Sequence, residues 1–232
     1  LIVYGAMAGL SVVKLYAGAF FPGIMLASAV QAYLNRYGVV PGKRITVYAN
    51  NDGARAVARQ LMAAGIEVAA ILDSRPDASA VEDCPVYLGA EVTDTKGRHG
   101  LRFISGRHAL GVFEIETDCL AVSGGWNPSV HLTCHMNGRP RWAEDIAAFV
   151  PSEGAVPGMV AAGAANGIFT THGCLAAGHD AAKAALKDLG LTAKATDLPR
   201  AEGLPYAITP LWAVEGKGRA WRRWRQQQVA LL

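Results

Sequence analysis

The sequence predicts an α/β protein built on a parallel sheet. Hydrophobic residues make up 51% of the 232 residues and charged residues only 18%, a balance typical of strands that are buried on both faces. Residues 45–73 follow the pattern strand, helix, strand: ITVYAN alternates branched and aromatic residues, ARAVARQLMAAG repeats apolar positions at helical spacing, and IEVAAILD is again apolar. Two strands joined by one helix imply a right-handed crossover, and therefore parallel strands.

The N-terminal part of the chain is apolar, and a helix is expected in it between Gly23 and Gly38, with Pro41 behind it. Residues 15–34 approach the length of a membrane span, but Pro22 interrupts them, so buried strands and a packed helix are favoured over a membrane protein. The chain starts at Leu1 and is apolar at once. We therefore expect either a piece of a longer protein or an incomplete reading frame.

The remaining elements follow the same rules. Residues 74–117 carry short alternating runs broken by glycines, which predicts a small antiparallel sheet. Residues 118–129 are expected to form a strand that ends in a double-glycine turn. Residues 156–190 are expected to form a strand, a glycine-alanine turn at 161–167 and a long alanine-rich helix. Residues 191–232 contain several prolines and are expected to be a linker and tail.

Charge, cysteines and motifs exclude several function classes. The net charge of +3 is too small to indicate a nucleic-acid partner, and four scattered cysteines without a CxxC pair fit a reducing cytoplasm. His131, Cys134 and His135 lie close together, but no four-ligand zinc spacing is present, so no metal site is expected. Ser123 lacks the G-x-S-x-G context of a hydrolase nucleophile, and there is no G-x-x-x-x-G-K-[ST] loop.

The turn after residues 45–49 has the place of a dinucleotide-binding turn but not its glycines. Ala49, Asn51 and Ala54 stand where glycines would let the backbone approach a pyrophosphate. Asp73 ends the second strand, where an acid would bind the 2′-hydroxyl of a ribose. The alternative is that Asp73 is a polar strand-end residue without a ligand. We expect this strand–helix–strand segment, one half-unit of a dinucleotide-binding fold, to have the shape of the site without binding a nucleotide.

The second glycine cluster, AAGAANG at 161–167, is expected to follow a strand and open a helix, where free N–H groups favour a phosphate. A tight packing turn is an equally good interpretation, because small residues also suit the contact of a helix with a sheet. Gly124 and Gly125 similarly allow the chain to cross close to a ligand.

Several ordered strings together resemble the alpha subunit of heterotetrameric sarcosine oxidase and its relatives among amine-oxidising flavoprotein complexes. The match runs from about Pro22 to about Trp212, and residues 1–21 and the C-terminal tail depart from the pattern. The strings are PGIMLASAVQAYLNRYGVVPGKR, VYANND, CLAVSGGWNPSVHL, VAAGAANGIFTTHGCLAAGHDAA and PYAITPLW.

The resemblance implies a Rossmann-like flavoprotein architecture with two dinucleotide-binding domains, as in disulfide reductases, incomplete at its N-terminus. Residues 1–23 would end the first dinucleotide-binding domain, and residues 24–117 would be the inserted second one. Residues 118–190 would return to the first, and residues 191–232 would be linker and tail.

The resemblance also implies the chemistry. The complete subunit would bind NAD or FAD, and the complex would use FMN or FAD to oxidise sarcosine to glycine, with tetrahydrofolate as acceptor of the one-carbon unit. Partners would be beta, gamma and delta subunits, without nucleic acid or membrane. No catalytic residue is expected in this chain, which alone would be inactive. The implied nucleotide-facing residues are Gly124, Gly163, Ala164, Ala165, Asn166 and Gly167.

Two other classes stay open at this point. One is a subunit of a related amino-acid or opine dehydrogenase, including a proline-type enzyme, which shares the architecture and differs in substrate and electron acceptor. The other is a noncatalytic interaction scaffold. Identification of the bound nucleotide would separate these classes, since a scaffold would carry none.

Overall fold

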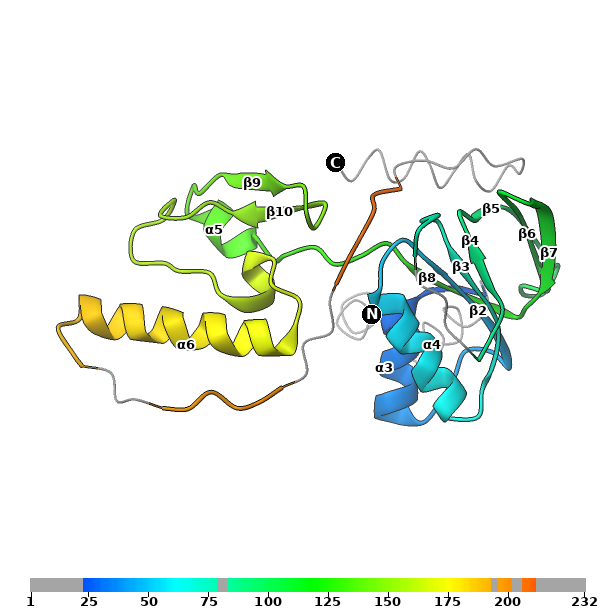
Figure 1. The fold of residues 1–232 in the computed structure, drawn as a ribbon, viewed down its shortest axis with the longest axis horizontal. Coiled ribbons are helices and arrows are strands. Elements are labelled where there is room, and N and C mark those ends of the chain that lie inside the picture. Colours follow the sequence, from blue (N-terminus) through cyan, green and yellow to red (C-terminus); the bar gives the residue numbers. More distant parts are fainter. Residues whose placement is uncertain (1–22, 79–82, 193–195, 202–205, 212–232) are drawn as a thin grey trace, which may run out of the picture. The chain divides into compact units, whose positions relative to one another are not determined.

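The computed structural model describes residues 23–78, 83–192, 196–201 and 206–211, which fall into two compact units (Figure 1). The first unit comprises the described residues up to Gly124 together with 210–211, and the second comprises those from Gly125 to Thr209. The predicted termini, residues 1–22 and 212–232, lie outside the described residues.

The first unit alternates strands and helices and then adds a run of strands. Its elements are β1 (Ile24–Leu26), α3 (Ala27–Tyr37), β2 (Arg44–Ala49), α4 (Gly53–Ala63), β3 (Glu67–Asp73), β4 (Val86–Leu88), β5 (Glu91–Lys96), β6 (Phe103–His108), β7 (Gly111–Glu116) and β8 (Cys119–Ser123). Five of the strands form one sheet in the order β1-β8-β2-β3-β4, and every pairing in it is parallel. The predicted parallel α/β fold is therefore confirmed.

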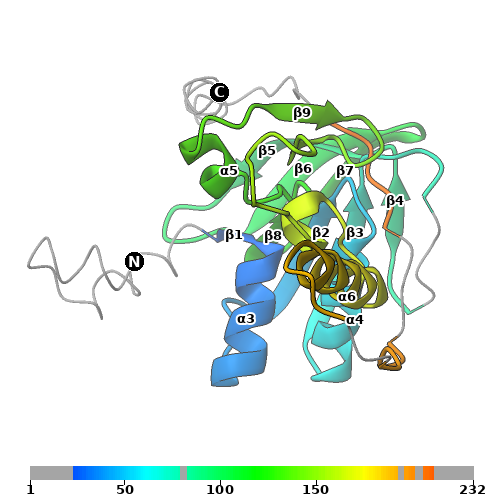
Figure 2. The ribbon, with the colours of Figure 1, turned by 90° about the vertical axis from the view of Figure 1, so that its left-hand side faces the viewer.

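The two faces of the parallel sheet are covered by different layers (Figures 1 and 2). Alternate residues of β2, such as Ile45 and Val47, pack with Val30 of α3 and Leu61 of α4 in one core. Strand residues pointing the other way, such as Leu72 of β3, pack with the antiparallel sheet β5-β6-β7 in a second core. The sheet is thus buried on both faces, as its apolar strands require.

One prediction for the first unit differs from the structure. The expected helix from Gly23 starts only at Ala27, because Ile24–Leu26 pair with β8 as strand β1. Its predicted end is confirmed, since Gly38 adopts a left-handed conformation with φ of 62° and caps α3. Strand β8, which follows the boundary predicted before residue 118, lies between β1 and β2 in the sheet of the first unit. The assignment of first and second dinucleotide-binding domains stays a prediction.

The second unit contains a short helix, a hairpin, a 3₁₀ turn and a long helix. Its elements are α5 (His131–His135), β9 (Pro140–Ala143), β10 (Ala148–Pro151), η1 (Gly163–Asn166) and α6 (Thr171–Asp188). The strand predicted just before residues 161–167 is absent from the described structure, which shows no strand pairing for residues 156–162. An isolated strand would leave its backbone groups unpaired. None of the 18 residues of α6 is buried.

Within the residues that the structure describes, no helix has the length and apolarity needed to cross a bilayer.

The packing of α4 can be tested by truncating Leu61, whose side chain is fully buried against the sheet. Leu61→Ala should lower the free energy of unfolding by about 2–5 kcal/mol, because it removes buried methyl groups and leaves a cavity. Urea denaturation followed by circular dichroism measures this change. The control is Leu110→Ala, since Leu110 is 92% exposed in the turn between β6 and β7. Equal effects of the two substitutions would contradict the described core.

Candidate functional site

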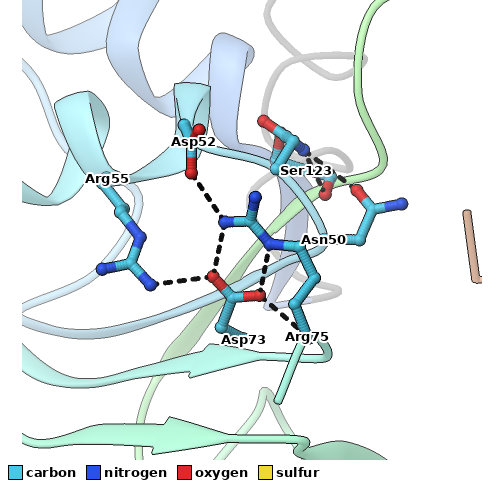
Figure 3. Close-up of polar contacts among 7 residues, drawn as sticks. Asn50, Asp52, Arg55, Asp73, Arg75 and Ser123 are labelled. Atoms are coloured by element: carbon cyan, nitrogen blue, oxygen red, sulfur yellow. Dashed lines mark hydrogen bonds and ion pairs between the residues drawn. The ribbon is translucent and has the colours of Figure 1, made fainter. Parts of the chain in front are cut away.

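Five buried polar side chains of the first unit lie at or just beyond the carboxyl ends of β2 and β3, next to the end of β8: Asn50, Asn51, Arg55, Asp73 and Arg75. Open α/β sheets bind ligands at this edge. The register places these ends together, because Ala49 pairs with Asp73 on one side and with Ser123 on the other. We call this group the sheet-edge cluster (Figure 3). Its members are Asn50, Asn51, Asp52, Arg55, Asp73, Arg75 and Ser123.

Asn51 ties the turn after β2 to the end of β8. Its side chain is fully buried, and Nδ2 donates to the backbone oxygen of Ser123 at 3.1 Å and to Ser123 Oγ at 3.0 Å. Nδ2 also lies 3.0 Å from Asn50 Oδ1. An amide group therefore holds the inside of the turn, where a dinucleotide-binding turn has only glycine and backbone N–H groups.

Asp73 is fully buried, and arginines occupy both of its carboxylate oxygens. Arg75 donates from Nε to Oδ1 at 3.0 Å and from Nη2 to Oδ2 at 2.9 Å, and its backbone N–H donates to Oδ1 at 3.0 Å. Arg55 Nη2 adds a further bond to Oδ2 at 2.9 Å. The strand-end acid is thus neither exposed nor without a partner.

The network continues from Arg75 to the start of helix α4. Arg75 Nη2 donates to Asp52 Oδ1 at 2.7 Å, and Asp52 is the residue immediately before the helix. Arg55 lies in the first turn of the same helix. Two aspartates and two arginines therefore join the end of β3 to the beginning of α4 (Figure 3), and their formal charges cancel.

The electrostatics of the network favour the charged forms of Asp73 and Arg75. Burial by itself raises the pKa of Asp73, but hydrogen bonds from Arg75 and Arg55 outweigh burial and hold that pKa below its usual value. The hydrogen bond to Asp73 in turn raises the pKa of Arg75 against the effect of burial. Arg55 is less well satisfied, because its Nε and Nη1 are buried without a hydrogen-bond partner in the described structure.

The sheet-edge cluster does not fit the ribose of a dinucleotide. A ribose hydroxyl would need an acceptor on Asp73, and both oxygens already accept charge-assisted bonds from arginines, which are stronger than bonds from a neutral hydroxyl. Gly124, just beyond β8, is different. A Cβ at Gly124 would meet no atom of the described residues within 4 Å, so packing among those residues does not explain this glycine.

The second glycine cluster forms the 3₁₀ turn η1 rather than the first turn of a long helix. Gly163 and Gly167 both have left-handed backbones, with φ of 62° and 83°. A Cβ on Gly167 would lie 2.6 Å from Ile146 Cδ1, so packing explains this glycine. Ala164 and Asn166 are exposed. One side of the turn therefore packs against the unit, while the other side is free of protein contacts that would bury it.

The expectation that 161–167 open a helix is wrong, because helix α6 begins only at Thr171 and has its own cap. Thr170 Oγ1 accepts a hydrogen bond from the backbone N–H of Gly173 at 3.2 Å. The donor groups of this helix end are thus partly used within the protein. His131, Cys134 and His135 form helix α5, and no group of three ligand side chains suited to a metal occurs in the described part of the chain.

Arg55 and Arg75 are the residues that sequence reasoning missed. The available signal was their position: one arginine lies in the first turn of the helix after β2, and the other lies two residues beyond the strand-end acid. A carboxylate buried at a strand end needs a compensating charge. These two positions are near enough in the βαβ unit to supply it.

Comparison with known proteins finds relatives that share one name. No protein family model matches the chain. Sarcosine oxidase subunit alpha from Rhizobium meliloti (strain 1021) is 36% identical over 205 residues, which are 87% of this chain and 21% of the relative. The subunit of the same name from Corynebacterium sp. (strain U-96) is 35% identical over 208 residues, 83% of this chain and 21% of the relative.

Solved structures show the same fold. L-proline dehydrogenase from P. horikoshii has a TM-score of 0.56 at 18% identity, covering 75% of this chain and 32% of that one. Thioredoxin reductase from T. acidophilum has a TM-score of 0.54 at 20% identity, covering 72% and 58%. These likenesses concern the fold alone, and they confirm the predicted Rossmann-like α/β architecture.

The chain spans about a fifth of the length of the curated relatives that it matches. It matches them at 35–36% identity over more than four fifths of its own length. The chain is therefore a relative of one region of sarcosine oxidase subunit alpha, as its sequence strings predict.

Proposed function

We propose that this chain is a nucleotide-binding and scaffold region of the alpha subunit in a sarcosine oxidase-like complex. The observation that carries the proposal is 36% identity over 205 residues to a protein named sarcosine oxidase subunit alpha. Flavin-dependent oxidative demethylation of sarcosine to glycine is the activity proposed for the whole complex. The likeness to reductase and dehydrogenase structures supports the architecture of this region.

In the proposed complex, a bound flavin supplies the acceptor for a hydride from the N-methyl carbon of sarcosine. The resulting imine is hydrolysed or its one-carbon unit passes to tetrahydrofolate. The proposed partners are beta, gamma and delta subunits. This chain would provide no acid, base or nucleophile for the reaction, and its proposed role is to bind the nucleotide and to hold the fold.

The proposed nucleotide contacts of this chain are the 3₁₀ turn Gly163–Gly167 and, separately, Gly124. The nucleotide would be NAD or FAD. Two observations support these positions: Ala164 and Asn166 are exposed in a turn of small residues, and Gly124 has open space where a side chain would be. Backbone groups of such turns are able to approach a pyrophosphate closely.

The first prediction concerns activity. The purified 232-residue chain should not oxidise sarcosine, because the proposed substrate chemistry belongs to another subunit. Hydrogen peroxide formation and dye reduction measure this directly, with the assembled complex as positive control. Turnover of sarcosine by the isolated chain would refute the assignment of a scaffold role.

A second experiment separates the proposed enzyme from its alternatives. Nucleotides are extracted from the assembled complex and identified by mass, and sarcosine, proline and opines are assayed side by side. We expect a flavin and a preference for sarcosine. A preference for proline or an opine would replace the proposed substrate, and absence of any nucleotide would support a noncatalytic scaffold.

The turn at 163–167 can be tested without straining its glycines. Ala164→Glu places a negative charge on an exposed position of the turn, where it would repel a pyrophosphate and lower nucleotide affinity by about tenfold or more. Ala184→Glu, on an exposed position of α6, is the matched control. Affinity is measured by titration of NAD and FAD into the full-length subunit. Equal affinity of the two variants would remove this turn from the site.

A further inference from the structure

We propose that the side chain of Arg75 occupies the position at the end of β3 where the ribose of a dinucleotide would bind. The network Asp52–Arg75–Asp73–Arg55, which we call the latch, then excludes dinucleotides from the half-unit 44–73 and holds its strands and helix together. This inference concerns only the first unit. It does not depend on the proposed function.

The guanidinium of Arg75 takes both acceptor positions that a ribose diol would use. A ribose presents two neighbouring hydroxyl groups to a strand-end carboxylate. Arg75 instead presents Nε and Nη2, which lie 3.0 and 2.9 Å from Oδ1 and Oδ2 of Asp73. The planar fork of an arginine matches the two oxygens of a carboxylate in this way. The same two lone-pair directions are therefore filled from within the chain.

A ligand would compete poorly with this occupant. The bonds from Arg75 are charge-assisted and those from a ribose are not. Arg75 is also part of the same chain, two residues after Asp73, so it loses no translational freedom when it binds the carboxylate. A free ligand would lose translational freedom on binding. Arg55 Nη2 holds Oδ2 as well, and displacement would leave two buried guanidinium groups without their carboxylate. Asn51 adds a steric obstacle in the turn.

The side chain of Arg75 and the backbone of residues 73 and 75 together join three segments of the unit. Arg75 Nη2 reaches Asp52 ahead of α4, while the backbone oxygen of Arg75 accepts from the N–H of Gly89 at 3.1 Å. The backbone oxygen of Asp73 accepts from the N–H of Ala90 at 2.9 Å, just before β5. The end of β3 is thereby connected both to the helix on one face and to the antiparallel sheet on the other.

The latch is tested by removing Arg75 and adding back its head group. Arg75→Ala should raise the equilibrium constant for unfolding roughly a hundredfold or more, because it leaves the buried Asp73 with Arg55 as its remaining arginine partner. Guanidinium ion at a nondenaturing concentration should restore part of the loss. Sodium ion at equal ionic strength should not. The control is Arg44→Ala, which removes an exposed ion pair with Glu67 at 3.0 Å. Neither guanidinium nor sodium ion should restore stability in this variant.

If Arg75→Ala does not fold, Arg75→Lys keeps the charge without the planar fork and should show an intermediate loss of stability. Absence of any loss in both variants, or restoration by sodium ion as good as that by guanidinium, would overturn the latch.

Closure to dinucleotides is tested on the wild-type chain by calorimetric titration with NAD and with ADP-ribose. We expect no binding that depends on Asp73. Binding that is unchanged in Asp73→Asn supports the proposal, because the ligand then lies at another site. Binding that is lost in Asp73→Asn, while circular dichroism shows an intact fold, would overturn it.

Discussion

The first unit depends on one electrostatic constraint: a carboxylate at the end of β3 is fully buried and must remain compensated. An isolated charge in such a place is strongly unfavourable. Arg75 and Arg55 resolve this with direct bonds to both oxygens of Asp73. Because one arginine comes from helix α4 and the other from the segment after β3, compensation of the charge also fixes how these elements meet.

A comparable arrangement lies at the amino ends of the strands, opposite the sheet-edge cluster. Asp118, just before β8, accepts the backbone N–H groups of Lys43 and Arg44 at 2.8 and 3.0 Å. Strand β2 is therefore bounded at its start by Asp118 and at its end by the sheet-edge cluster. The polar groups that another protein would turn toward a ligand are here used for internal structure.

Much of the fold follows from the sequence because the strands and helices of the first unit have strong and regular apolar patterns. The helix end at Gly38 was predictable, since a left-handed cap favours glycine. The start of α3 was not, because Ile24–Leu26 suit a helix as well as a strand, and only the pairing with β8 decides between them. The prediction of a strand before Gly163 was wrong for a related reason. A local apolar pattern does not by itself make a strand, and no neighbouring strand pairs with this segment among the described residues.

The site was only partly predictable. Asn51, at a position where a dinucleotide-binding turn needs glycine, predicts an obstructed half-unit, and this stays a prediction. The sequence offered no pattern that paired Asp73 with two arginines. Asp73 is held in its ionised form by two arginines of the same chain, which keep its pKa below the ordinary value. A pKa lowered by folding adds stability that is fully present above the ordinary value of about 3.9 and is lost as pH falls through the lower folded value.

The most direct measurement is therefore an NMR titration of the ¹³C-labelled carboxyl group of Asp73 in the folded wild-type chain. The account predicts a midpoint below the ordinary aspartate value and no change in it when NAD is added. A midpoint at or above the ordinary value, or one that shifts on addition of NAD, would contradict it.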